Sequence, residues 1–234
     1  MEIKQISEHI WSLKTWMIVP FHVWVVKEED GVTLVDAGIG KMGKGILKFI
    51  NGMDAGPLKR IVLTHGHPDH VGALKAILKE NEVPVYVHKA EIPYMEGKKA
   101  YPGRKKPSAN VTEHLVQPLM EDEAGNLNKI DSLEPYWTPG HAPGHVVYYH
   151  PEDGVLLAGD LFTSKNGKLY RPMPMFTYDM EEAVRSSRIV GELKPKRLEI
   201  CHGKAVLNPA DHLDQYIENT SNTYSIKEEN VYKG

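Results

Sequence analysis

Apolar and polar residues alternate along the first third of the chain in the manner of β-strands. Two apolar runs, His22–Val26 and Val32–Asp36, flank a polar Asp30-Gly31 turn, which is typical of a β-hairpin. The spacing of apolar residues over Met42–Asn51 predicts a short helix. The pattern then predicts two strands and two helices, in the order Arg60–His65 (strand), Val71–Glu80 (helix), Val83–His88 (strand) and Lys89–Gly97 (helix).

The second half of the chain continues this mixture of strands and helices. The runs GVLLAGD and RLEICHG predict two more strands. Asp179–Leu193 is predicted to be a helix capped by Asp179, and Asn208-Pro209 supplies the cap and first-turn proline of the last helix. Segments 98–116 and 164–178 have no clear period, and long irregular loops in compact domains are often functional. We therefore expect one α/β domain over residues 1–234, with both irregular segments near its site.

Composition limits the classes of partner. The chain is 41% hydrophobic and 25% charged, with a net charge of −3, which is ordinary for a globular protein and lacks the basic excess of a nucleic-acid binder. The basic run at Lys98-Lys99 and Arg104–Lys106 is expected to be a solvated loop. No apolar window approaches the roughly 18 residues of a membrane span. A single cysteine, Cys201, and an N-terminus without an apolar signal run predict a cytoplasmic location, and the oligomeric state stays open.

One short stretch, THGHPDHVG (Thr64–Gly72), concentrates metal-binding side chains. His65 and His67 are two apart in a loop that leaves a strand, so both can project to one side and bind the same ion. Asp69 and His70 begin the following helix and can serve a second ion. Further candidates lie at three other strand ends, namely His141, His145, Asp160 and His202. Nitrogen and oxygen ligands of this kind suit zinc, manganese or iron.

The order of these motifs carries a family resemblance. The runs LVDAG, THGHPDHVG, TPGHAPGH, LLAGD and CHG occur along nearly the whole chain, and together they resemble the metallo-β-lactamase superfamily, in its glyoxalase II and lactonase-like metallohydrolase branch. The resemblance implies a four-layer αββα sandwich of two sheets with helices outside and the site along one edge.

The resemblance also implies a role for each motif residue. His65, His67 and His145 would bind a first metal ion, and Asp69, His70 and His202 a second, with Asp160 bridging both. His141 is not a ligand in this scheme and is expected to be structural or to support a ligand. Asp36 matches a position that hydrogen-bonds a ligand histidine, and such a carboxylate fixes the orientation of the ring.

The activity implied is metal-dependent hydrolysis of a small ester, lactone or thioester. Two divalent ions, zinc first with manganese or iron as alternatives, would share one water and lower its pKa from about 15.7 to about 7. The bridging hydroxide would attack, with Asp69 positioning it and carrying its proton. A mononuclear iron persulfide dioxygenase and a phosphodiesterase of the same fold are the alternatives.

Departures from the family pattern disfavour several activities known in the superfamily. His67 stands where flavodiiron oxygen reductases carry glutamate, and Asp160 stands where zinc β-lactamases carry cysteine, so both activities are disfavoured. Thr163 replaces the tyrosine that many lactonases carry after the bridging aspartate, which lowers the expectation of a lactonase. The tail after His202 is short and poor in basic residues for a glutathione thioester.

Specificity is expected to come from the irregular segments and the first hairpin. An apolar pocket with one cationic group would favour a small acyl substrate, and an arginine would suit a substrate carboxylate. The alternative is that these residues only cover the sheet. The expected pocket residues are His22, Tyr101, Arg171, Met173, Met175 and Phe176.

Overall fold

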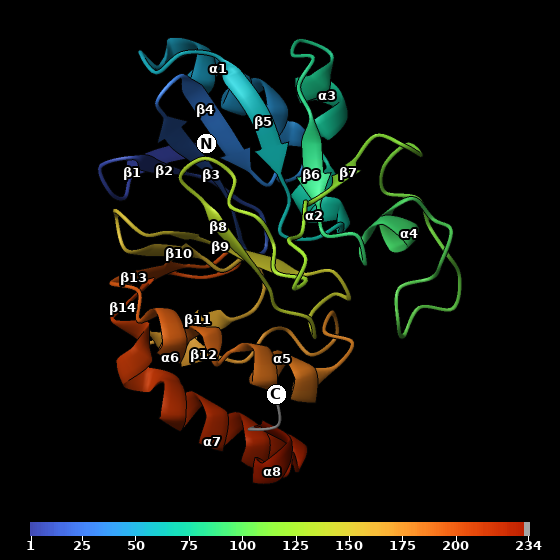
Figure 1. Cartoon of the computed structure of the whole chain (residues 1–234), viewed down its shortest axis with the longest axis vertical. Coiled ribbons are helices and arrows are strands. Elements are labelled where there is room, and N and C mark those ends of the chain that lie inside the picture. Colours follow the sequence, from blue (N-terminus) through green and yellow to red (C-terminus); the bar gives the residue numbers. More distant parts are fainter. Residues whose placement is uncertain (232–234) are drawn as a thin grey trace.

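Two β-sheets pack face to face, and helices cover the outer face of each (Figure 1). The computed structural model describes residues 1–231. In Figure 1 the order from top to bottom is helices α1 and α3, the first sheet, the second sheet, and helices α5 to α8. The αββα order expected from the sequence is confirmed.

The first sheet contains seven strands within residues 1–231. It is antiparallel from β1 to β4 and parallel from β4 to β7. The expected first hairpin is confirmed as the pairing of β3 with β4. The strands in spatial order are β1 (Glu2–Gln5), β2 (Ile10–Trp16), β3 (Pro20–Glu28), β4 (Gly31–Val35), β5 (Leu58–Val62), β6 (Val85–Val87) and β7 (Gln117–Pro118).

The second sheet contains five strands in the described part of the chain. Only the pairing of β10 with β13 is parallel. Its strands in spatial order are β14 (Val206–Leu207), β13 (Arg197–Glu199), β10 (Val155–Leu157), β9 (Val146–His150) and β8 (Glu134–Trp137). A separate hairpin joins β11 (Thr163–Lys165) to β12 (Lys168–Tyr170).

Short helices follow the strands and close both outer faces. Those that follow strands of the first sheet are η1 (Gly40–Met42), α1 (Gly43–Gly52), α2 (Pro68–Val71), α3 (Leu74–Leu78) and α4 (Ile92–Met95). Those beside the second sheet are α5 (Met180–Ser186), α6 (Ile189–Leu193), η2 (Pro209–His212), α7 (Leu213–Tyr224) and α8 (Glu228–Val231). None of the helices in residues 1–231 is long and apolar enough to cross a membrane.

Period-two alternation in the strands builds the layers. Val23 and Val25 of β3 pack with the helices above the first sheet, whereas Trp24 and Val26 face the second sheet. Successive side chains of a strand point to opposite faces, so a strand covered on both sides is apolar throughout. The same alternation places Leu156 of β10 against the lower helices.

Two predicted helices are each divided in the structure. The helix expected over Val71–Glu80 is interrupted between α2 and α3. The backbone N–H of Ala37 donates to the carbonyl of His70 at 2.7 Å, and a continuous helix would use that carbonyl for its own hydrogen bond. The helix expected over Asp179–Leu193 breaks after α5, where the Ser187 hydroxyl donates to the carbonyl of Val184 at 2.6 Å. Hydroxyls that bond nearby carbonyls compete with the regular helical ladder.

Of the two predicted helix caps, one is confirmed and the other is wrong. Asp179 is the N-cap of α5, and its carboxylate accepts the backbone N–H of Glu182 at 2.9 Å, which confirms that prediction. Asn208 is not a side-chain cap: its φ is 45°, and the turn after it is the 3₁₀ helix η2, so α7 begins only at Leu213. The helix expected over Lys89–Gly97 is only the single turn α4.

Candidate metal centre

The end of β4 fixes one histidine of the motif. Asp36 is buried, has a φ of 60°, and directs its carboxylate at the loop after β5. It accepts the backbone N–H and the hydroxyl of Thr64, both at 2.8 Å, and the Nδ1–H of His70 at 2.8 Å. Because Nδ1 is held in this way, Nε2 of His70 faces the centre of the site.

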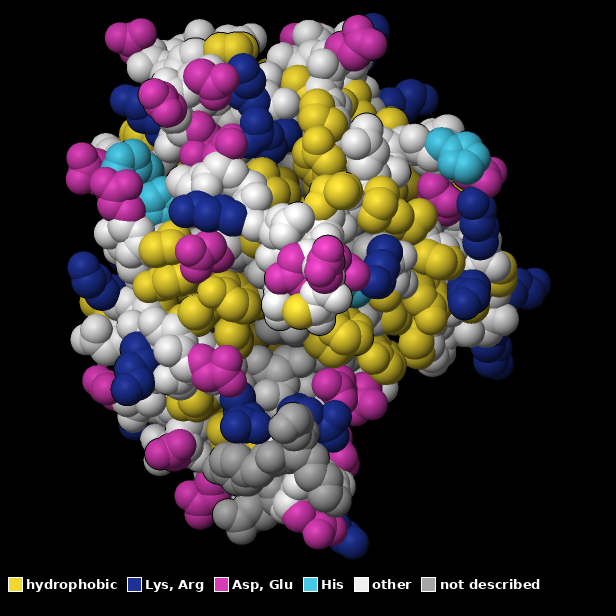
Figure 2. Space-filling view, viewed as in Figure 1, with side chains coloured by type: hydrophobic (Ala, Val, Ile, Leu, Met, Phe, Trp, Pro, Cys, Tyr) yellow, Lys and Arg dark blue, Asp and Glu magenta, His cyan; other side chains and the backbone are white. Residues whose placement is uncertain are grey.

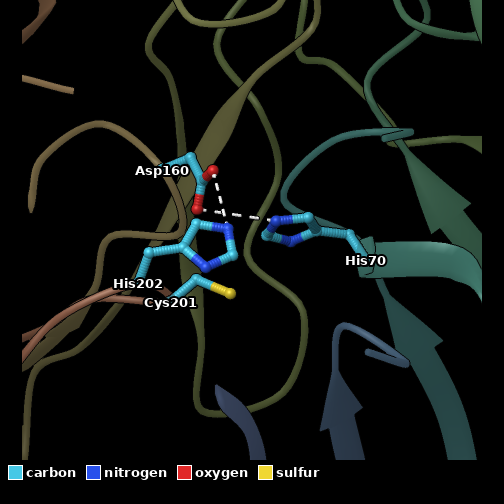
Figure 3. A group of neighbouring side chains, drawn as sticks. All are labelled: His70, Asp160, Cys201 and His202. Atoms are coloured by element: carbon cyan, nitrogen blue, oxygen red, sulfur yellow. Dashed lines mark ion pairs between the residues drawn. The ribbon is translucent and has the colours of Figure 1, made fainter. Parts of the chain in front are cut away.

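His70 and His202 lie beside Asp160, the acid that follows β10 (Figure 3). Nε2 of His70 lies 3.5 Å from Oδ1 of Asp160, and Nε2 of His202 lies 3.2 Å from Oδ2 of the same carboxylate. The Nδ1–H of His202 donates to the carbonyl of Pro20 at 3.0 Å, and Nε2 also lies 3.0 Å from Oδ2 of Asp69. The four residues drawn in Figure 3 form one group of potential ligands, namely His70, Asp160, His202 and the buried Cys201.

A second group of histidines lies on the other side of Asp160. Nε2 of His65 is 3.0 Å from Nδ1 of His67, which is 3.1 Å from Nε2 of His141. Nε2 of His141 is in turn 3.5 Å from Oδ2 of Asp160. The Thr64 hydroxyl donates its hydrogen to Asp36 and therefore acts as an acceptor toward Nδ1 of His65, which lies 3.1 Å away. Nδ1 of His65 then carries the ring proton, and Nε2 of His65 faces this group unprotonated.

His145 lies beside this second group. Its ring centroid is 5.3 Å from that of His65, its Nδ1 is 2.9 Å from the hydroxyl of Thr138, and its Nε2 accepts the backbone N–H of Asp160 at 3.2 Å. His141 was expected to be structural or supporting, yet its own Nε2 joins the group. The structure thus places all seven expected ligands in one region of the molecule. His141 belongs to one of the two groups of converging ligand atoms, whereas Asp69 and His145 lie beside these groups.

The donor set fits divalent metal ions. Nε2 of His70 and Oδ1 of Asp160 are buried and have no hydrogen-bond partner among the described residues. Leaving such atoms without a partner is costly, and native proteins rarely do so. Imidazole nitrogens and carboxylates that converge on one centre are the donors that zinc, manganese and iron take in proteins.

Electrostatics of the site favour a positive ion. Burial lowers the pKa of His145 to about 3 and that of His67 to about 4, so both rings are neutral, the form that binds metal. Burial also acts to lower the pKa of His202, but the Asp160 carboxylate outweighs it and raises that pKa. A site that stabilises a cationic imidazolium in this way also attracts a metal cation.

A pocket of about 260 Å³ opens beside the second group of histidines. His67 and His141 line its inner side, and three of the expected pocket residues, Tyr101, Met175 and Phe176, line its walls. The Tyr101 ring packs 4.9 Å from that of His67. The remaining lining residues are Pro102, Gly103, Arg104, Pro174, Thr177 and Tyr178.

Three other expected pocket residues lie elsewhere. The Arg171 guanidinium donates to the hydroxyl of Tyr224 at 2.9 Å and packs over two tyrosine rings, so it does not line this pocket. His22 lies in a separate groove at the sheet edge, with Nδ1 2.7 Å from the Ser12 hydroxyl. Met173 is also absent from the lining, although its carbonyl accepts the Thr177 hydroxyl.

The cationic side chain at the pocket is instead Arg104. It belongs to the segment after α4, over which Lys and Arg side chains gather at the right-hand edge of the molecule (Figure 2). This run was expected to be only a solvated loop. Four of its five basic residues fit that expectation, being exposed and absent from the pocket lining, whereas Arg104 is exposed and also lines the pocket.

Comparison with known proteins identifies the family. The family model described as the metallo-beta-lactamase superfamily matches residues 18–202. The chain belongs to this superfamily. The probable metallo-hydrolase YybB of Bacillus subtilis is 34% identical over 221 residues, covering 93% of this chain and 98% of that protein. The chain is accordingly a metal-dependent hydrolase of the superfamily, as expected.

Other relatives agree with this placement. A hydroxyacylglutathione hydrolase of Aeromonas hydrophila is 30% identical over 154 residues, covering 65% of this chain and 51% of that protein. A metallo-beta-lactamase structure from Erythrobacter litoralis shares the fold with a TM-score of 0.71 at 16% identity, covering 93% of this chain and 96% of that one. The structure of TTHA1623 in a di-iron-bound form has a TM-score of 0.63 at 25% identity, covering 84% and 94%.

Sequence reasoning missed one buried acid at this superfamily site. Glu91, just before α4, is fully buried, and its carboxylate accepts hydrogen bonds from Gly66, Tyr101 and Gly144. In the sequence it stands in HKAEIPYM, apart from the motif runs, and nothing in its spacing marks it. Only the fold brings it between the two histidine loops.

Proposed function

We propose that this metallo-hydrolase cleaves a small ester, lactone or thioester with the help of two divalent metal ions. Zinc is the first choice, with manganese or iron as alternatives. The observation that carries the proposal is the place of Asp160. Its carboxylate lies 3.5 Å from Nε2 of His141 and of His70, and 3.2 Å from Nε2 of His202, between the two groups of histidines.

Each group would hold one ion. His65, His67 and His145 would bind the first ion and Asp69, His70 and His202 the second, with Asp160 shared. When bound, two such ions lower the pKa of a shared water to about 7 and so supply a hydroxide nucleophile. His141, whose Nε2 belongs to the second group of histidines, has no assigned role in this scheme.

Asp69 is the residue we assign to proton handling. Its side chain is 29% exposed at the mouth of the site, with Oδ2 3.0 Å from Nε2 of His202. A carboxylate that is both anchored and open to solvent can orient an attacking water and carry its proton to a leaving group. No serine or cysteine nucleophile is then required.

The pocket beside His67 favours a small acyl substrate. Apolar walls from Tyr101, Met175 and Phe176 suit an acyl group, and Arg104 suits a carboxylate on it. The similarity to a hydroxyacylglutathione hydrolase supports a thioester among these substrates, and the di-iron form of TTHA1623 supports iron among the metals. The substrate is a small molecule, with neither nucleic acid nor membrane as partner. A cytoplasmic location and a single domain over residues 1–234 stay predictions.

A substrate panel tests the proposal. The protein loaded with zinc, manganese or iron is assayed on lactones, acyl thioesters, phosphodiesters and a β-lactam, before and after chelation. The expected result is chelator-sensitive hydrolysis of a thioester, ester or lactone and little turnover of the β-lactam. Preferred hydrolysis of phosphodiesters, or turnover that survives complete metal removal, would contradict it.

A further inference from the structure

Glu91 carries a buried carboxylate that the proposed chemistry does not use. Its backbone is fixed at the start of α4, where its N–H donates to the carbonyl of His88 at 2.9 Å and its carbonyl accepts from Met95 at 3.1 Å. Oε1 accepts the backbone N–H of Gly66 at 2.9 Å and the hydroxyl of Tyr101 at 2.6 Å. Oε2 accepts the backbone N–H of Gly144 at 2.7 Å.

The three donors belong to three separate parts of the site. Gly66 lies between His65 and His67, and Gly144 immediately precedes His145. These two loops carry all three histidines assigned to the first ion. Tyr101 belongs to the wall of the substrate pocket. One carboxylate therefore joins both ligand loops and the pocket.

Close packing makes this junction specific. A Cβ added at Gly144 would lie 2.5 Å from Cβ of Glu91, and one added at Gly66 would lie 2.7 Å from the Tyr101 hydroxyl. A real Cβ atom essentially never lies this close to a non-bonded atom, so both glycines are needed for the approach. The Asn110 side chain holds the Gly66 carbonyl at 2.8 Å, which leaves the loop little freedom.

We propose that Glu91 is the positioning residue that sets the distance between the His65–His67 loop and the His145 loop, and so the affinity of the first ion. The proposal rests on the proposed function. Neither loop has regular secondary structure at these residues, so their separation depends on such links. Charge-assisted hydrogen bonds that a buried carboxylate accepts from backbone N–H groups are among the strongest available. Loss of a partner that orients metal ligands typically costs 10- to 100-fold in metal affinity.

A glutamine substitution separates positioning from general stability. Glu91→Gln keeps the shape of the side chain but offers only one acceptor oxygen, so one of the two backbone links is lost. The matched control is Glu134→Gln, which also removes a carboxylate bonded to a tyrosine hydroxyl, that of Tyr136, but in β8 of the second sheet. Tyr101→Phe removes only the link to the pocket.

The experiment is a zinc titration of each metal-free protein in competition with a chromophoric chelator, with thermal unfolding and steady-state kinetics beside it. Glu91→Gln is expected to lower the affinity for one of two ions by about 10- to 100-fold and to leave the affinity for the other unchanged. In a His202→Ala background, which is expected to retain only the first ion, Glu91→Gln is expected to lower the affinity for that ion by the same factor. Tyr101→Phe is expected to raise KM with both ions retained, and Glu134→Gln to change neither.

Two results would overturn the positioning role. One is unchanged affinity for both ions in Glu91→Gln. The other is an equal weakening of both ions that follows the loss of thermal stability, since a purely structural residue would act in that way. If the wild-type protein binds two ions and hydrolyses its substrate, either result rejects this inference alone. A wild-type protein that binds fewer than two ions rejects the proposed function together with it.

Discussion

The carboxylate of Asp36 lies 2.8 Å from Nδ1 of His70, and this contact turns Nε2 of His70 toward Asp160. Asp36 is thus tied to the site although it touches none of the other expected ligands. The residue lies at a φ of 60°, a conformation that asparagine tolerates well.

Asp36→Asn is therefore expected to keep the fold and lose metal. The amide is a weaker acceptor for the His70 N–H, so we expect 10- to 100-fold lower zinc affinity, measured by chelator competition. Asp30→Asn, at an exposed acid paired with Lys59 in the turn after β3, is the control and is expected to bind as the wild type does. Unchanged affinity in Asp36→Asn would reject this role.

Asp69→Asn tests proton handling separately from metal binding. The amide keeps an oxygen near His202 but cannot take a proton. A positioned acid–base group contributes about 10²- to 10⁴-fold to rate. Turnover is therefore expected to fall within that range, and metal content to fall by much less. Parallel loss of metal and of turnover would reduce Asp69 to a simple ligand.

Arg104→Ala tests the choice of substrate. The guanidinium lines the pocket beside His67. We expect kcat/KM for substrates with a carboxylate to fall by up to about 5-fold, as an exposed ion pair of up to about 1 kcal/mol allows. Neutral substrates of the same size are expected to change little. Arg171→Ala is the matched control, because Arg171 contacts Tyr224 rather than the pocket. Equal effects on acidic and neutral substrates would contradict the assignment.

The N-terminal region has its own pH-dependent contact. The Nδ1 atom of His9 lies 2.8 Å from the carboxylate of Asp153, and this hydrogen bond raises the pKa of His9 above its ordinary value of 6.5. A raised folded-state pKa means that the contact contributes its full stability below pH 6.5. The contribution is lost as pH rises through the raised pKa. His150, Glu8 and Glu152 are the other titratable groups nearby.

His9→Gln is thus expected to cost the most stability near pH 5.5 and progressively less above the pKa of His9. Urea unfolding of metal-free wild type and variant across pH 5.5 to 9 measures the difference. His114→Gln, at a histidine whose side chain is 84% exposed, is the control variant. A difference that grows with pH would have the wrong sign for this contact.

Much of the candidate metal site could be predicted because its residues are marked in the sequence. Histidines and aspartates such as His65, Asp160 and His202 stand at strand ends in runs with a fixed order, and sheet edges bring such ends together. The four-layer fold was expected from the family resemblance that the order of the motifs carries, and the apolar alternation of the strands agrees with it.

The pocket residues and the residues that hold the ligand loops in place could not be predicted to the same degree. Arg171 and Arg104 both stand in irregular segments, and only the tertiary path of the chain shows that Arg104 reaches the pocket while Arg171 packs on Tyr224. Glu91 is linked to Gly144, 53 residues away, by a hydrogen bond that leaves no periodic signal. The prediction of an unbroken helix over Val71–Glu80 failed because Ala37 bonds a carbonyl that the local pattern assigns to the helix. The prediction over Asp179–Leu193 failed because the Ser187 hydroxyl bonds the carbonyl of Val184.

Metal content tests the central claim most directly. The protein is purified without added metal, and the ions per chain are quantified by elemental analysis. We predict two ions of zinc, manganese or iron per chain, held by the seven expected ligands, with Asp160 shared by both ions. One iron per chain, with oxygen uptake on a glutathione persulfide, would contradict it and identify a mononuclear dioxygenase.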